Sequence, residues 1–154
     1  MTIQLLEQSL EALEYGRILE LLAEQCSCPD SAARARSLRP LPDAGSAAEE
    51  IRRVQDAGRL TLQFGGPPFS GLSDIDSALS RAKIGSALSA GELLRVAGVL
   101  GAVRRLCQYR QASESLSTSL DGLFDSLVPN KYLEEKIEAS IVGEDEIADA
   151  ASSE

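Results

Sequence analysis

Residues 89–110 read SAGELLRVAGVLGAVRRLCQYR and give the strongest helix signal in the chain. Ser89 and Glu92 have the spacing of a capping box, in which the serine side chain accepts from a free amide of the first turn and the glutamate reaches back. Apolar residues then recur at intervals of three and four, the period of one helix face. They are Leu93, Val96, Ala97, Leu100, Val103 and Cys107. This stretch predicts a long amphipathic helix packed on a core.

Helices are also predicted on both sides of this stretch. Ser46 and Glu49 have capping-box spacing and precede a helix with an apolar stripe. That stripe consists of Ile51, Val54, Gly58 and Leu62. Ser73 is the predicted N-cap of a helix over 74–84 that ends at Gly85. Further helices are predicted over 13–26, 29–38 and 131–140, with a short one ending at Val128.

The composition favours an all-α fold. Hydrophobic residues make up 44% of the 154 residues, aromatic residues only 4%, and there is no tryptophan, so the core is built mainly from aliphatic side chains. That palette suits packed helices better than a sheet sandwich or barrel. We predict one helical core domain over 1–140, followed by an acidic segment over 141–154 that includes a short β-hairpin. No apolar run reaches a membrane span and residues 1–10 lack signal-peptide features, so a cytoplasmic location is expected.

The sequence offers few groups for catalysis or metal binding. It contains no histidine, and the three cysteines, an odd number, do not form a disulfide framework or a zinc ligand set. The glycine-rich segment 65–71 is followed by Asp74 and Asp76 where a phosphate loop would continue with lysine and serine or threonine. Carboxylates that are neighbours in the sequence lie at helix starts or on charged helix faces, where capping and solvation are expected. They are Glu49 with Glu50, Asp74 with Asp76, and Glu134 with Glu135 and Glu138. We therefore predict no catalytic, cofactor-binding or metal-ligating residue.

Charge is distributed unevenly along the chain, whose net charge is −9. Residues 134–154 hold eight acidic residues and one lysine, whereas residues 34–110 hold twelve basic residues, eleven of them arginine, and seven acidic ones. An arginine-rich region is able to contact phosphate; the alternative is a set of solvated helix faces. The candidate contacts with nucleic acid or a partner, called here the arginine set, are Arg52, Arg53, Arg59, Arg95, Arg104, Arg105 and Arg110.

The order of these segments resembles the N-terminal region of the bacterial MutS-two family, the MutS paralogues that carry a C-terminal Smr domain. The resemblance begins in the segment 13–22, LEYGRILELL, and continues through Leu38-Arg39-Pro40 and the helix after Ser46. It then includes 71–75, GLSDI, as well as 92–94, ELL, and the closing segment 143–152. Each piece alone is a helix with a turn, and it is their order that resembles the family.

The resemblance implies a role in nucleic-acid work. The matching region of the family resembles the MutS core, a helical hub from which lever helices run to a clamp. The ATPase domain, with its ATP and Mg, and the Smr nuclease domain lie further along the chain, and none of their catalytic residues has a counterpart here. The full-length family implies suppression of recombination on branched DNA, or rescue of collided ribosomes through ribosomal RNA.

We accordingly expect a non-catalytic core module that transmits motion between ATPase and clamp. Its expected partners are the remainder of its own chain, DNA or the ribosome through the full-length protein, and a second copy in a homodimer, because apolar surface normally covered by the lever helices is then exposed. The alternative is a stand-alone helical adaptor for protein interactions without nucleic-acid binding. The net charge of −9 favours this alternative, since nucleic-acid binders are usually basic.

Overall fold

The computed structural model describes residues 3–143, 146 and 147, and its fold is all-α, as predicted. The chain divides into two compact units, Met1–Pro40 and Leu41–Glu154. Each is described here by itself. The prediction of one helical domain over 1–140 stays a prediction. No helix in the described part of the chain combines the length and apolarity needed to cross a bilayer.

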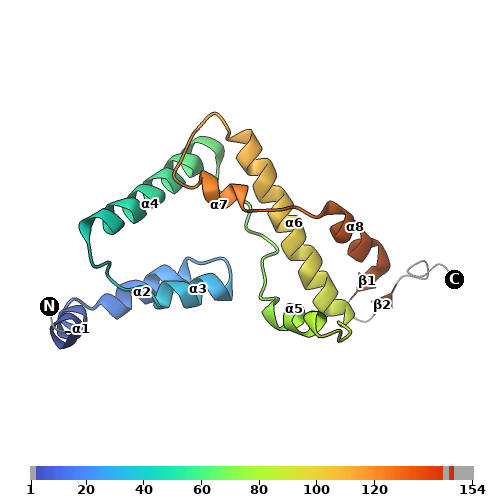
Figure 1. Cartoon of the computed structure of the whole chain (residues 1–154), viewed down its shortest axis with the longest axis horizontal. Coiled ribbons are helices and arrows are strands. Elements are labelled where there is room, and N and C mark those ends of the chain that lie inside the picture. The colour runs from blue at the N-terminus through green and yellow to red at the C-terminus, as the bar shows by residue number, and fades with distance from the viewer. Residues whose placement is uncertain (1–2, 144–145, 148–154) are drawn as a thin grey trace. The chain divides into compact units, whose positions relative to one another are not determined.

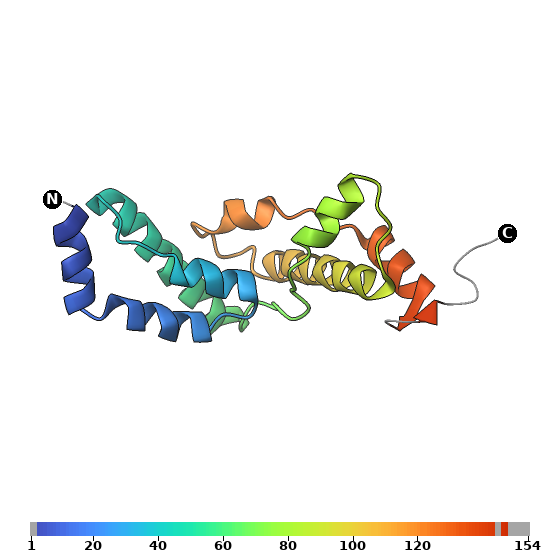
Figure 2. The same ribbon diagram turned by 90° about the horizontal axis from the view of Figure 1, so that it is seen from below.

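The first unit holds α1 (Ile3–Ala12), α2 (Tyr15–Glu24) and α3 (Pro29–Arg36). Its small core consists of Leu10, Leu19, Ala23 and Ala35. Helices α2 and α3 lie side by side, as Figures 1 and 2 show, and Arg36 Nε donates to Glu20 Oε2 across them at 2.9 Å. The sequence did not indicate α1. The predicted start of the next helix at Leu13 was also wrong, because Glu14 adopts a left-handed backbone, φ 51°, that separates α1 from α2.

The second unit is organised around α6 (Ala90–Ala112), the helix predicted most strongly. The Ser89–Glu92 capping box is present: Ser89 Oγ accepts from the Glu92 amide, and Glu92 Oε2 accepts from the Ser89 amide. Helix α8 (Lys131–Ser140) packs along α6 (Figure 1). The buried side chains between them are Val96, Ala97, Ile137 and Ile141.

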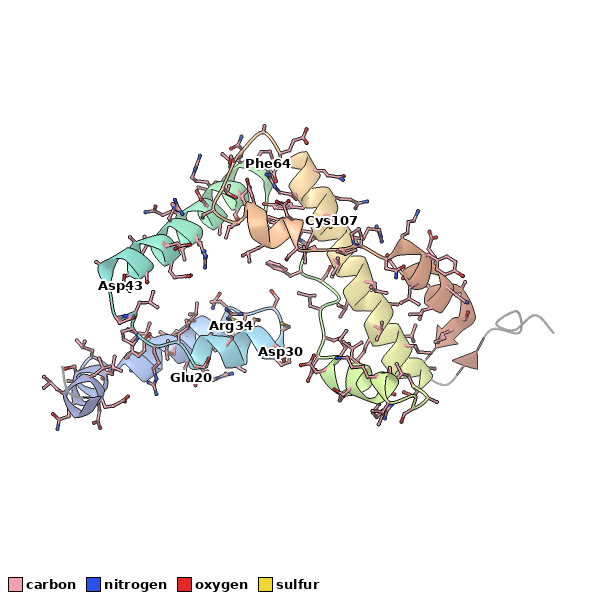
Figure 3. All side chains as sticks on the ribbon, viewed as in Figure 1. Glu20, Asp30, Arg34, Asp43, Phe64 and Cys107 are labelled. Atoms are coloured by element: carbon pink, nitrogen blue, oxygen red, sulfur yellow. The ribbon has the colours of Figure 1, made fainter. Side chains whose placement is uncertain are left out.

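Two predicted helix starts differ from the structure. Helix α4 (Ala44–Phe64) begins two residues before Ser46, because Asp43 is its cap and accepts from the Ser46 amide at 2.8 Å; Figure 3 marks Asp43 and Phe64 at the two ends. Helix α5 (Asp76–Lys83) starts after Ile75 rather than after Ser73. Asp74 accepts from the Asp76 amide at 2.9 Å, while the buried Ser73 hydroxyl has no hydrogen-bond partner among the described residues.

The remaining elements are short. Helix α7 (Asp121–Asp125) lies within the short helix predicted before Val128. Strands β1 (Ile141–Gly143) and β2 (Glu146–Ile147) pair antiparallel, with Ile141 opposite Ile147, in the segment where the sequence indicates a hairpin. The rest of the predicted acidic segment, residues 144–145 and 148–154, lies outside the described residues.

The stripe predicted on α4 faces away from the core of the second unit. Ile51, Val54 and Leu62 are exposed, whereas Asp56 and Leu60 are the buried residues of this helix. This stripe is therefore not the face through which α4 packs on the second unit. Periodicity identifies an apolar face, and here a different face of the helix meets the rest of the unit.

Candidate interaction sites

Three members of the arginine set, Arg104, Arg105 and Arg110, hold segments of the second unit together. Arg104 is the clearest case: its Nε and Nη2 donate to the two carboxylate oxygens of Glu134 on α8, at 2.9 and 2.7 Å. Glu134 is buried, and the bidentate pair lowers the pKa of its carboxyl while raising that of Arg104. The sequence interpretation of Glu134 as part of a solvated acidic face was wrong for this residue.

Arg105 and Arg110 fasten loop segments of the second unit to α6. Arg105 Nη2 donates to the Ser70 carbonyl at 2.6 Å, which holds the glycine-rich segment against α6. Arg110 pairs with Asp121 at 3.1 Å and also donates to the Ser113 carbonyl at 3.1 Å. Both side chains donate hydrogen bonds within the second unit, so neither presents all its donors to a phosphate.

The other four arginines lie on α4 and α6. Arg53 pairs with Glu49 and Glu50 along one face of α4 at 2.9 and 2.6 Å. Arg59 donates to Asp56 at 3.0 Å and leaves more than half of its side chain exposed. Arg52 and Arg95 are exposed and form no ion pair with other described residues. The structure therefore does not gather the arginine set into one basic patch, and Arg52 and Arg95 are its most available members.

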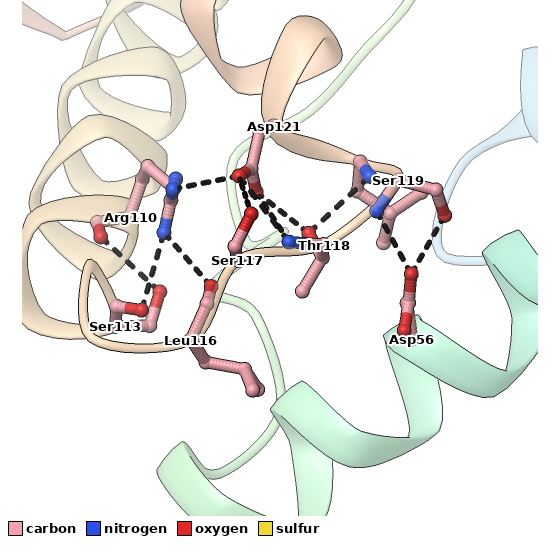
Figure 4. A network of polar contacts seen from close by, with 9 residues as sticks. Asp56, Arg110, Ser113, Leu116, Ser117, Thr118, Ser119 and Asp121 are labelled. Carbon is pink, nitrogen blue, oxygen red and sulfur yellow. Dashed lines mark hydrogen bonds and ion pairs between the residues drawn. The ribbon is translucent and has the colours of Figure 1, made fainter.

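A polar network fixes the loop 113–120 between α4, α6 and α7 (Figure 4). Asp56 Oδ2 accepts from the amide and the hydroxyl of Ser119, both at 2.8 Å. Asp121 accepts from the Thr118 hydroxyl at 2.7 Å and from Arg110. These hydrogen bonds hold the pKa of both carboxyls below their ordinary range, Ser119 being the main cause for Asp56 and Thr118 for Asp121. Asp56 could not be identified from the sequence, because its partner Ser119 lies 63 residues away.

Beside this network lies an apolar cleft of about 350 Å³. Its walls come from α4, the segment 67–69, α6 and the region of α7. The lining residues are Ala57, Leu60, Thr61, Pro67, Phe69, Leu106, Tyr109, Leu120, Leu123, Phe124 and Leu127. The Tyr109 hydroxyl donates to the Gly65 carbonyl at 2.8 Å, and its ring lies 6.3 Å from that of Phe124. Burial raises the pKa of Tyr109.

The chemistry of this cleft suits binding rather than catalysis. Its lining is aliphatic and aromatic, and the two hydroxyls, of Thr61 and Tyr109, have no adjacent general base among the lining residues. Such a surface accepts apolar side chains of a partner. In the described part of the chain, no three His, Cys, Asp or Glu side chains gather to hold a metal ion. Cys26, Cys28 and Cys107 are free thiols.

The chain is similar to several curated bacterial proteins over almost its whole length. It is 35% identical over 148 residues to "Endonuclease MutS2" of Clostridium beijerinckii, and 35% identical over 150 residues to the protein of the same name from Acetivibrio thermocellus. The protein of that name from Alkaliphilus oremlandii is 29% identical over 150 residues. These matches cover 95–96% of the chain. No family model matches it.

These matches confirm the resemblance to the MutS-two family. The chain spans only about a fifth of the length of these relatives, 19% in each of the three. The similarity thus concerns one segment of a much longer protein, and the activity in the relatives' name belongs to the whole relative.

Proposed function

From this similarity to the endonuclease MutS2 proteins, we propose that the chain acts as a non-catalytic helical core module of a MutS2-like protein, corresponding to its N-terminal region. One observation carries the proposal: 95% of this chain is similar to a segment that makes up about a fifth of the relative's length. The interior supports it: arginines and carboxylates are paired with one another to fasten helices, which suits a part that transmits force. Catalysis, with its ATP and Mg, would reside in other parts of the protein.

A chimaera tests the module. The 148 matched residues of the Clostridium beijerinckii relative are replaced by this chain, and nuclease activity is measured beside the parent and a deletion of the same segment. We expect the chimaera to retain activity that the deletion loses, and the 154-residue chain alone to have none. Activity of the chain alone, or a chimaera no better than the deletion, would contradict the proposal. A chimaera carrying Gly71→Ala is the control for a damaged fold.

We also propose that any direct contact with DNA or ribosomal RNA uses Arg52 and Arg95. Both are exposed and unpaired with other described residues, unlike Arg104, whose substitution would break a buried ion pair. Binding of the chain to duplex DNA, branched DNA and ribosomes is measured across a salt series. We expect Arg52→Glu with Arg95→Glu to weaken binding and to reduce the salt dependence by about one to two released counterions.

The control is Arg17→Glu, which changes an exposed arginine of the first unit whose only ion pair among the described residues is with the exposed Glu14. An unchanged affinity in the double variant would remove nucleic-acid contact from the proposal and leave the core-module role standing. Absence of any binding at low salt, together with binding of a protein partner through the apolar cleft, would favour the adaptor. The net charge of −9 and the cleft support that second candidate.

A further inference from the structure

Helix α4 has two faces of different character. At 3.6 residues per turn, Leu60 lies on the side opposite Ile51. Leu60 is 3% exposed and lines the apolar cleft, whereas Ile51 is 58% exposed. Val54 and Leu62 follow Ile51 along the same side and are 71% and 91% exposed. The outer face of α4, defined by Ile51, Val54, Gly58 and Leu62, is thus an apolar stripe that the second unit itself does not cover.

The stripe has the form of a helix-packing seam. Its members follow one another at intervals of three, four and four residues, so they stay aligned over three turns. Gly58 lies in the middle, and a Cβ added there would meet no atom within 4 Å, which leaves room for a close approach. Single exposed apolar residues are ordinary on a protein surface, but an aligned series on one long helix marks an interaction face.

The charges beside the stripe select the partner. Arg52 and Arg59 lie seven residues apart, about a quarter turn from Ile51, and so form one basic edge of the outer face. Arg52 is exposed without an ion pair to other described residues, and Arg59 keeps 58% of its side chain exposed while it contacts Asp56. The opposite edge carries Glu50, which is paired with Arg53 just as Arg59 is paired with Asp56, so Arg52 is the charge on these edges that has no ion pair among the described residues. A helix that docks here is therefore favoured if it presents carboxylates to the basic edge.

The same charges disfavour a second copy of α4. In an antiparallel pair, a two-fold axis places each edge against its own counterpart, so the basic edges would face one another. In a parallel pair the basic edge would face Glu50, whose carboxylate is held by Arg53 at 2.6 Å. Neither arrangement supplies new opposite charge to Arg52 and Arg59.

We propose that the outer face of α4 docks an amphipathic partner helix that has an apolar stripe and an acidic edge. The apolar contact comes from Ile51, Val54 and Leu62, and Gly58 allows the partner helix to approach closely. The basic edge formed by Arg52 and Arg59 favours a partner with carboxylates. Arg52 is also a proposed contact with nucleic acid, so a docked helix and nucleic acid would compete for it. The docking proposal requires neither that contact nor the outcome of the chimaera experiment.

Two synthetic helical peptides test the proposal on the 154-residue chain. Both have the length of α4 and a leucine stripe, and they differ only in one edge, which carries glutamates in one peptide and lysines in the other. Fluorescence anisotropy gives their affinities. We expect the glutamate peptide to bind about twofold to fivefold more tightly, as expected for one or two exposed charge pairs. Arg52→Glu is expected to remove or invert that preference, whereas Arg95→Glu, on α6, leaves it unchanged.

Removing apolar atoms from the stripe tests its location. Ile51→Ala with Leu62→Ala is expected to weaken binding of the glutamate peptide at least tenfold, on the order of the loss expected when several buried methylene groups are removed from the contact. Val128→Ala removes an apolar group that is 79% exposed outside the stripe and is the matched control. Circular dichroism checks that each variant remains folded, which the exposure of these side chains favours.

Three results would overturn the proposal. Equal affinity for both peptides would remove the role of the basic edge. Binding that survives Ile51→Ala with Leu62→Ala would place the site elsewhere. Concentration-dependent dimerisation in sedimentation velocity that this double variant abolishes would identify a second copy as the occupant.

Discussion

A single close approach between two glycines joins the glycine-rich segment to α6. Gly71 has φ +85°, and a Cβ there would lie 2.9 Å from the Gly98 carbonyl oxygen. Gly98 faces the same contact from the helix side, with an added Cβ 3.1 Å from the Gly71 carbonyl oxygen. Gly98 thus allows α6 to contact a loop closely, whereas Gly101 faces the side chain of Glu134 on α8.

We predict that Gly71→Ala destabilises the chain by about 1–3 kcal/mol, because alanine is strained at this φ and its Cβ would clash with backbone that cannot rotate away. Urea unfolding followed by circular dichroism measures the change. Gly66→Ala is the matched control, since it lies in the same segment at a φ outside the left-handed region with no atom within 4 Å of the added Cβ. Equal effects of the two substitutions would contradict the assignment.

Acid is predicted to destabilise the chain through Asp56, Asp121 and Glu134, whose pKa values are all lowered by their partners. Because these carboxyls have lower pKa values in the folded state, the unfolded state binds more protons in acid. The stabilisation that the three ionised carboxylates provide is complete above their unfolded pKa of about 4 and is lost as the pH falls through their folded pKa values. Urea unfolding between pH 6 and roughly pH 3 measures it. Asp56→Asn and Ser119→Ala should each reduce this pH dependence, and wild-type dependence in both would count against the network.

At the scale of elements, the packing of α8 on α6 combines an apolar seam with one buried carboxylate. The seam includes Val96 and Ile137. Glu134 lies one turn before Ile137 on α8 and accepts two hydrogen bonds from Arg104. A buried carboxylate is costly unless paired, so this ion pair fixes how α8 is aligned along α6.

Glu134→Gln is predicted to lower the free energy of unfolding more than Glu135→Gln. The first substitution leaves the Arg104 guanidinium without its anionic partner. The second affects only the exposed pair of Glu135 with Lys131, for which about 0.3–0.5 kcal/mol is expected. Thermal unfolding of both variants gives the comparison, and similar losses would show that the Arg104–Glu134 pair contributes no more than a surface pair.

Local signals in the sequence were enough for the elements whose ends are fixed by their own residues. The Ser89–Glu92 capping box predicted the start of α6, and the Ser89 hydroxyl accepts the expected amide bond. The helix predicted over 131–140 is α8, and its N-cap Asn130 accepts from the Leu133 amide. Helix α4 started earlier than predicted because Asp43 competes with Ser46 for the cap. The Arg104–Glu134 pair could not be predicted, because residues 30 positions apart are brought together only by tertiary packing. The pairs of Arg53 and Arg59 are local, at spacings of three and four residues on α4.

The two compact units differ in the size of their own buried cores. Among its described residues the first unit buries four aliphatic side chains, whereas the second has the α6–α8 seam, the 113–120 loop network and α4. Chains near 40 residues rarely bury enough surface to fold without further support.

We predict that residues 41–154 alone retain helical structure and unfold cooperatively, while residues 1–40 alone are largely unstructured in water. Circular dichroism and thermal unfolding of the two fragments, beside the whole chain, measure this. A non-cooperative 41–154 fragment would show that its stability depends on the first unit.

The uncovered apolar side chains, from Ile18 and Leu21 on α2 to Leu62 on α4, also affect how the chain responds to temperature. Unfolding can hydrate only the apolar surface that folding has hidden, and this hydration sets the heat capacity change. An average chain of this length would show about 1.8–2.3 kcal/mol/K, at 12–15 cal/mol/K per residue. We expect calorimetry to give a smaller value here. The stability of the chain would then vary unusually little between cold and warm conditions, and binding of a partner that covers these side chains would restore the missing heat capacity.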